Sequence, residues 1–202
     1  MKIALTVILG LAAASTSAKA AVINFDSVST AFFIDNVTDN NFVLARTDDG
    51  MATLAAGYNE SYWRGNGTGR LLTFSNEGST SGFTMSNISG DPFSLVSFDF
   101  ANGYVNQDQP FASLTLTGLH AGGGTVSTTI NNLSSGWTTA TMPAGWTGLD
   151  SVKIVANGSV NRAVFDNIVV NGAASVPEGG STLALLSLAA FGIGMLPRRL
   201  KG

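Results

Sequence analysis

The chain has 202 residues, of which 45% are hydrophobic and only 11% charged, and it contains 24 glycines and no cysteine. This length suits one domain with a real core, and a low charged fraction in a chain rich in Gly, Ser, Thr and Asn is typical of all-β secreted proteins. The lack of cysteine excludes disulfide scaffolds, thiol nucleophiles and Cys-ligated zinc or iron–sulfur sites.

The first 20 residues have the pattern of a secretory signal peptide. Lys2 supplies a basic start, residues 3–14 are almost wholly apolar, and Ala18 and Ala20 are the small residues that precede a cleavage site. An amino-terminal membrane anchor is the alternative, but about twelve apolar residues give only about 18 Å of helix against a hydrocarbon core of about 30 Å. We therefore expect export through the secretory translocon and cleavage after Ala20.

Residues 21–172 have a β pattern throughout. Apolar and polar residues alternate over 93–100, 112–117 and 149–155, which is the signal of half-buried strands. Pairs such as Asn102-Gly103 and Asn157-Gly158 supply turns between them, since Gly and Asn tolerate positive φ. The predicted fold is an all-β, antiparallel two-sheet sandwich of the jelly-roll type, with no competing amphipathic helix.

The carboxy-terminal segment, 173–202, combines a turn, a short apolar stretch and a basic end. The apolar stretch, 181–196, would form about 24 Å of helix, which is short for a permanent span, and the basic tail at 198–201 would stay on the cytoplasmic side. The pattern favours a segment that inserts transiently into the membrane and is then removed by proteolytic cleavage. A permanent membrane helix is the stronger alternative, and a glycolipid-anchor signal is the weaker one because it normally ends without a basic cluster.

The order of residues in this segment resembles a PEP-CTERM sorting signal. The resemblance covers about the last 27 residues, with Gly179 where the usual signal has a second proline. It implies a bacterial protein that is processed by an exosortase-type membrane protease and delivered to the cell surface or the exopolysaccharide matrix. The residues that carry the resemblance are Val176, Pro177, Glu178, Gly179, Gly180, Arg198 and Arg199.

The sandwich itself resembles the carbohydrate-binding-module-like domains often found in PEP-CTERM proteins. Residues 23–26 open its first predicted strand and 163–170 form its last. The resemblance implies a structural calcium ion held by Asp26 and Asp166, and two carboxylates with backbone carbonyls suit a cation that takes six to eight oxygens. Turn or capping roles for both aspartates are the alternative.

An aromatic segment is the one candidate for ligand recognition. Tyr58, Tyr62 and Trp63 lie in a polar, glycine-bounded stretch, 57–70, with Arg64 beside them. This stretch is predicted to be a loop, and exposed rings on a loop can stack on the flat C–H faces of sugars. The alternative is that one or two of these rings plug the end of the sandwich.

Charge and residue inventory narrow the function. Residues 21–176 carry five basic against twelve acidic residues, a net charge of −7, which argues against nucleic-acid binding. His120 is the only histidine, and no nucleophile elbow or dinucleotide fingerprint is present. We expect a non-catalytic surface or matrix protein that binds glycan or calcium. The alternative is a structural or adhesive protein, permanently anchored and without a ligand.

Overall fold

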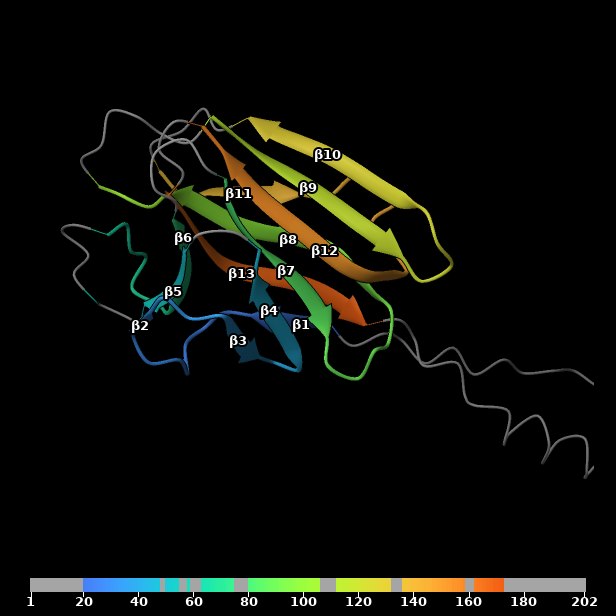
Figure 1. Ribbon diagram of the computed structural model, residues 1–202, viewed down its shortest axis with the longest axis horizontal. Helices are drawn as coiled ribbons and strands as arrows, with labels where there is room; N and C mark the ends of the chain where they lie inside the picture. Colours follow the sequence, from blue (N-terminus) through green and yellow to red (C-terminus); the bar gives the residue numbers. More distant parts are fainter. Residues whose placement is uncertain are drawn as a thin grey trace, which may run out of the picture. The chain divides into compact units, whose positions relative to one another are not determined.

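The computed structural model describes residues 20–47, 50–54, 58, 63–74, 80–105, 112–131, 136–158 and 162–172 (Figure 1). Within these ranges the regular structure is entirely β. The strands are β1 (Ala20–Ile23), β2 (Ala31–Phe32), β3 (Asn36–Asp39), β4 (Phe42–Arg46), β5 (Gly50–Leu54), β6 (Arg70–Phe74), β7 (Ser81–Asn87), β8 (Phe93–Asn102), β9 (Ser113–His120), β10 (Thr125–Asn131), β11 (Thr138–Thr141), β12 (Leu149–Asn157) and β13 (Arg162–Gly172).

The strands form two antiparallel sheets. The first sheet has the order β2-β5-β6-β13-β8-β11, with β1 also beside β13, and the second has the order β10-β9-β12-β7-β4-β3. A single pair, Leu149 with Phe93, links β12 of the second sheet to β8 of the first. The predicted antiparallel sandwich is therefore confirmed.

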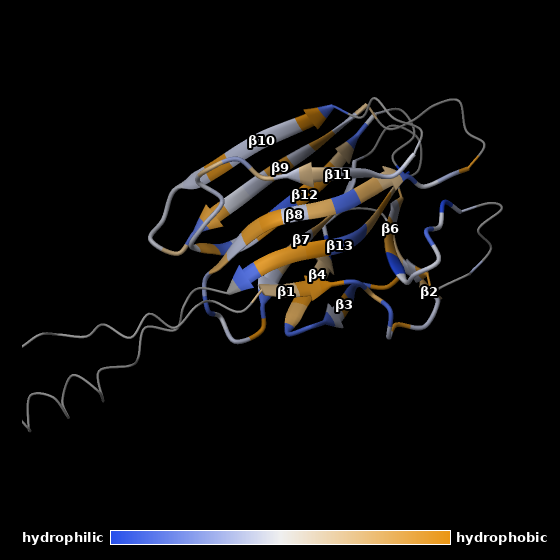
Figure 2. Ribbon diagram, turned by 180° about the vertical axis from the view of Figure 1, so that it is seen from behind, coloured by the Kyte–Doolittle hydropathy of each residue, from blue (hydrophilic) through white to orange (hydrophobic). Residues whose placement is uncertain are grey.

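The core between the sheets follows from the alternation in the sequence. Along β9, Leu114, Leu116 and Gly118 are buried, while Thr115 and Thr117 lie on the opposite face and are half-buried. Core residues also alternate along β8, β12 and β13, because successive side chains of a strand face opposite sides of the sheet. In each of these strands the period shifts by one residue at an irregularity, which lies between Leu95 and Phe98, between Leu149 and Val152, and between Phe165 and Ile168. Figure 2 shows the hydrophobic residues along β8 and β13. The largest core side chains include Phe83, Phe93, Phe98, Phe100 and Phe165.

A second apolar cluster lies on the outer face of the first sheet. It is formed by Ala52, Leu54, Leu72, Ala101 and Val164, and the half-buried Trp63, Phe74 and Trp137 pack against it. Register aligns Phe32, Ala52, Leu72, Val164 and Ala101 in one row across five strands. Because this face is also covered, β5 is buried along its whole length and β6 along most of its length.

Strand β13 changes neighbours halfway along. Its first residues, 162–165, pair with β6, and residues 168–171 pair with β1. The register against β8 shifts between Asp166 and Val169, and Asn167 has a positive φ of 49°. This irregularity opens the ladder beside Asp166, at the point where β1 ends and β6 begins.

The described residues contain no helix long and apolar enough to cross a membrane. Ala20, the predicted cleavage site, is the first residue of β1 and lies opposite Asn171. The rest of the predicted signal peptide lies outside the described residues, and so do the apolar stretch 181–196 and the sorting residues Val176, Pro177, Glu178, Gly179, Gly180, Arg198 and Arg199. Export and sorting therefore stay predictions.

Candidate functional site

Trp63 stacks on Tyr104, which follows the end of β8. The two residues form an antiparallel bridge, and their rings are nearly parallel, with centroids 4.7 Å apart and an interplanar angle of 16°. Arg64 secures this contact: its amide donates to the carbonyl of Gly103 at 2.8 Å, and its guanidinium donates to the carbonyl of Asn102 at 3.1 Å. The guanidinium also donates to the carbonyl of Tyr104 at 3.2 Å.

Arg162, the first residue of β13, lies against the same two rings. Its guanidinium carbon is 4.3 Å from the ring centroid of Tyr104 and 5.9 Å from that of Trp63. A guanidinium at this distance is attracted by the negative face of the ring. The carbonyl of Arg162 accepts the amide of Gly103 at 2.7 Å, which fixes the turn after β8 beneath the rings.

Exposed rings extend the stack toward β2. Phe32 is 40% exposed and Tyr58 is 38% exposed, and their centroids are 6.1 Å apart in an edge-on arrangement. Phe32 also lies 6.5 Å from Trp63. We call Phe32, Tyr58, Trp63, Tyr104 and Arg162 the aromatic cluster. Its members come from four separate parts of the sequence.

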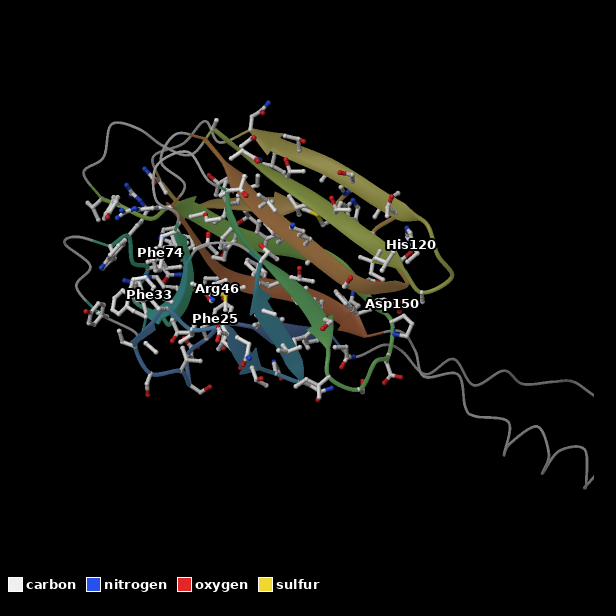
Figure 3. All side chains as sticks on the ribbon, in the orientation of Figure 1. Phe25, Phe33, Arg46, Phe74, His120 and Asp150 are labelled. Atoms are coloured by element: carbon white, nitrogen blue, oxygen red, sulfur yellow. The ribbon has the colours of Figure 1, made fainter. Side chains whose placement is uncertain are left out.

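A further exposed ring lies close to the cluster. Phe33 is 73% exposed and meets Phe74 edge-on at 5.2 Å. Figure 3 shows this pair at the end of the first sheet that carries β5 and β6. Large exposed apolar side chains that gather on one face mark an interaction surface more often than isolated ones do.

The predicted aromatic residues have different environments. Tyr58 is partly exposed, while Trp63 is half-buried against the outer face of the first sheet at the end of β8. Tyr62 lies outside the described residues. The segment therefore supplies both a packed ring and an exposed one.

Asp166 occupies the irregular point of β13 and is fully buried. Its Oδ2 accepts hydrogen bonds from Asn66 Nδ2 at 2.7 Å and from Thr68 Oγ1 at 2.6 Å. Its Oδ1 accepts the amide of Asn167 at 2.7 Å. The carboxylate thus ties the segment before β6 to the break in β13.

Asp26 approaches the same segment from the end of β1. Its Oδ1 accepts the amide of Gly69 at 3.2 Å and its Oδ2 accepts Asn24 Nδ2 at 2.6 Å. A side chain at Gly69 has no room, because a Cβ there would lie 1.9 Å from the carbonyl oxygen of Phe25. The structure therefore brings Asp26 and Asp166 to the two ends of one short segment, 66–69.

The turn that carries Asp26 is held in an unusual backbone conformation. Phe25 is fully buried and has a positive φ of 55°, which is rare for a bulky residue. Asp39 Oδ2 accepts the amides of Asn24 at 3.1 Å and Phe25 at 3.0 Å. These two hydrogen bonds offset the strain and fix the position of Asp26.

Burial raises the pKa of Asp166 above its ordinary value of 3.8. Hydrogen bonds from Thr68, Asn66 and the amide of Asn167 act in the opposite direction, and the nearby charge of Asp26 raises the pKa further. The surrounding side chains offer oxygen ligands: two carboxylates, a hydroxyl and the amide oxygens of Asn24 and Asn66. This set suits a hard cation such as Ca²⁺, which would also relieve the repulsion between the two carboxylates.

Among the described residues, no group of three or more His, Cys, Asp or Glu side chains could hold a metal ion. His120 Nδ1 lies 3.1 Å from the carbonyl oxygen of Thr147. Figure 3 shows His120 and Asp150 at the end of the molecule away from Phe33 and Phe74.

Sequence reasoning missed three members of the aromatic cluster. Phe32, Tyr104 and Arg162 are far from Trp63 in the sequence and meet it only through the sheet register. One signal was available for Arg162, because it is one of only five basic residues between 21 and 176.

Comparison with known proteins identifies an architecture. No family model matches the chain, and no curated protein matches it. Among solved structures, the chain is similar to a variant of the family 29 carbohydrate-binding module CBM29-2 complexed with cellulohexaose, with 12% identity, a TM-score of 0.50, and coverage of 77% of this chain and 92% of that one. A second CBM29-2 variant, complexed with mannohexaose, has 12% identity and a TM-score of 0.49 over 81% of this chain and 98% of that one. At this identity, the first likeness establishes a shared β-sandwich fold.

Proposed function

We propose that the sandwich is a non-catalytic glycan-binding module whose ligand stacks on the aromatic cluster. The observation that carries the proposal is the placement of Phe32 and Tyr58, both partly exposed, beside the Trp63–Tyr104 stack on one face of a sheet. Aromatic faces bury the C–H groups of a sugar ring while neighbouring polar groups bind its hydroxyls. The sandwich fold shared with a module complexed with cellulohexaose supports the same proposal.

The test is binding of the full chain to cellohexaose, mannohexaose and matrix exopolysaccharide by calorimetry. Phe32→Ala and Tyr58→Ala should each weaken binding by about 1–3 kcal/mol, by analogy with bases stacked on aromatic platforms, which is about ten- to a hundredfold. Ile88→Ala is the matched control, since Ile88 is an exposed apolar residue in the turn after β7. Binding that survives the double variant Phe32→Ala/Tyr58→Ala would contradict the proposal. No binding to any glycan would favour the structural or adhesive alternative.

A structural calcium ion at Asp26 and Asp166 is the second part of the proposal. Two carboxylates of like charge flank one segment, and the residues around them supply oxygen ligands. Binding to the folded state alone at a hundredfold excess over the dissociation constant stabilises it by about 2.7 kcal/mol. Excess chelator should therefore lower the melting temperature.

The response to chelator should vanish in Asp166→Ala and persist in Asp150→Ala, whose carboxylate is exposed on β12. A melting curve of the wild-type chain that does not change with chelator would leave both aspartates with purely structural roles in the turn and the bulge.

Export and sorting complete the proposal. The signal-peptide pattern and the PEP-CTERM-like tail support processing at both ends, after Ala20 and near 176–180, by the secretory pathway and an exosortase-type protease. The mature protein would then reside at the cell surface or in the extracellular matrix. Intact-mass measurement of the cell-associated protein is the test. A mature species that retains Arg198 and Arg199 would favour a permanent membrane anchor.

A further inference from the structure

We infer that the glycan bound at the aromatic cluster is an acidic polysaccharide, with carboxylate groups such as those of uronic acids. This inference rests on the proposed glycan-binding function and specifies its ligand. Three of the five basic residues between 21 and 176, namely Arg64, Arg70 and Arg162, lie at the cluster. The other two, Arg46 and Lys153, lie on strands of the second sheet.

Arg64 is positioned by neutral acceptors. Its guanidinium donates to the carbonyl oxygens of Asn102, Tyr104 and Val105 at 3.1–3.3 Å. Carbonyl acceptors orient a guanidinium without cancelling its charge. The half-buried Arg64 therefore places a fixed positive charge at the edge of the Trp63–Tyr104 stack.

Two further arginines, Arg162 and Arg70, contact members of the aromatic cluster. Arg162 lies over the ring of Tyr104, with its guanidinium carbon 4.3 Å from the ring centroid, and so places a second positive charge at the stack. Arg70 is fully buried and donates to the carbonyl of Tyr58 at 3.0 Å, so it holds the exposed tyrosine in place.

The positive charge is local in an otherwise acidic body. A net charge of −7 over 21–176 repels a polyanion, so an acidic glycan is attracted only where arginines gather. The nearest carboxylates on this face of β13 and β8, Asp166 and Asp99, lie one register row beyond Val164 and Ala101 and accept hydrogen bonds from neighbouring side chains. The apolar row thus separates Arg162 from these two carboxylates, whereas Arg70, which precedes Leu71, lies in the register row of Asp166.

The experiment compares the affinity of the full chain for a galacturonic acid hexamer and for cellohexaose at low and high salt. We expect the hexauronate to bind about tenfold or more tightly than the neutral hexamer at low salt, the order given by one charge-assisted hydrogen bond. The preference should shrink as salt screens the charges. Arg64→Gln should remove most of the preference, and Arg64→Lys should restore part of it by keeping the charge.

Lys153→Gln is the matched control, because it removes one positive charge from the outer face of the second sheet. Equal or tighter binding of cellohexaose at low salt would overturn this inference and leave the proposed function intact, whereas no binding of either hexamer would overturn the proposed function itself. A preference that is independent of salt, or that persists in a folded Arg64→Gln variant, would also overturn the inference. Should Arg64→Gln fail to fold, the salt dependence of the wild-type chain decides.

Discussion

Removal of the Trp63 ring tests whether the aromatic cluster is a packed unit of the fold. Trp63→Ala deletes the stack with Tyr104, the contact with Phe32 and the cation–π contact with Arg162. Truncation of a fully buried aromatic residue costs about 3–5 kcal/mol, and Trp63 is half-buried, so the free energy of unfolding should fall by about 2 kcal/mol. For a chain of this size, that loss corresponds to a decrease of about 4–8 °C in melting temperature.

A double-mutant cycle isolates the stack from the rest of the loss. Urea unfolding of Trp63→Ala, Tyr104→Ala and the double variant should give a coupling energy of about 0.5–1.5 kcal/mol, as for other aromatic pairs. The control is a second cycle that combines Phe33→Ala with Tyr104→Ala. The ring of Phe33 packs on Phe74, so the effects of these two substitutions on the free energy of unfolding should add to within about 0.5 kcal/mol. A coupling between Trp63 and Tyr104 no larger than that of the control would refute the stacked arrangement.

Three further predictions concern the turn and the bulge beside Asp166. Gly69→Ala should lower the free energy of unfolding by about 3 kcal/mol, because the added Cβ would overlap the carbonyl oxygen of Phe25. Gly122→Ala is the control: there is open space around Gly122, so the free energy of unfolding should change by less than about 0.5 kcal/mol. Equal losses in urea unfolding would argue against the close approach at Gly69. Asp39→Ala should cost about 2 kcal/mol by releasing the two amides that hold Phe25 at positive φ, and an unchanged midpoint would mean that the turn is stable without them. Because burial raises the pKa of Asp166, the folded state binds the proton of this carboxyl more tightly than the unfolded chain does, so the free energy of unfolding should fall as pH rises from 3.8 to the raised pKa. This dependence on pH should disappear in Asp166→Asn. A dependence that remains in the variant would belong to another titratable group.

The sequence pattern predicted the long strands and missed the short covered ones. Alternation identified what became β8, β9 and β12, because each has one face in the core and one face in contact with solvent or polar neighbours. The runs in β5 and β6 are buried on both faces, so they lack a two-residue period. Their burial depends on the cluster that covers the outer face, which no local pattern reveals.

The candidate site was predicted in part for a similar reason. Tyr58, Trp63 and Arg64 are close in sequence, and composition alone drew attention to them. Tyr104 and Arg162 reach Trp63 through strand register, over separations of tens of residues. The arrangement of Asp26 and Asp166 around Gly69 depends on a positive φ at Phe25, which no sequence pattern predicts. Long-range register and backbone strain are properties of the assembled sheets.

Strand β13 runs from the aromatic cluster at one end of the sandwich to the opposite end. Arg162 begins the strand at the aromatic cluster and Gly172 ends it, and ten steps of about 3.4 Å separate the two by about 34 Å. Ala20 lies opposite Asn171, so the polypeptide enters and leaves the sandwich at the same end (Figure 1). Attachment to any support through either of these chain ends therefore leaves the ring-bearing end of the sandwich facing outward, where a long polymer can reach it without steric interference from the support.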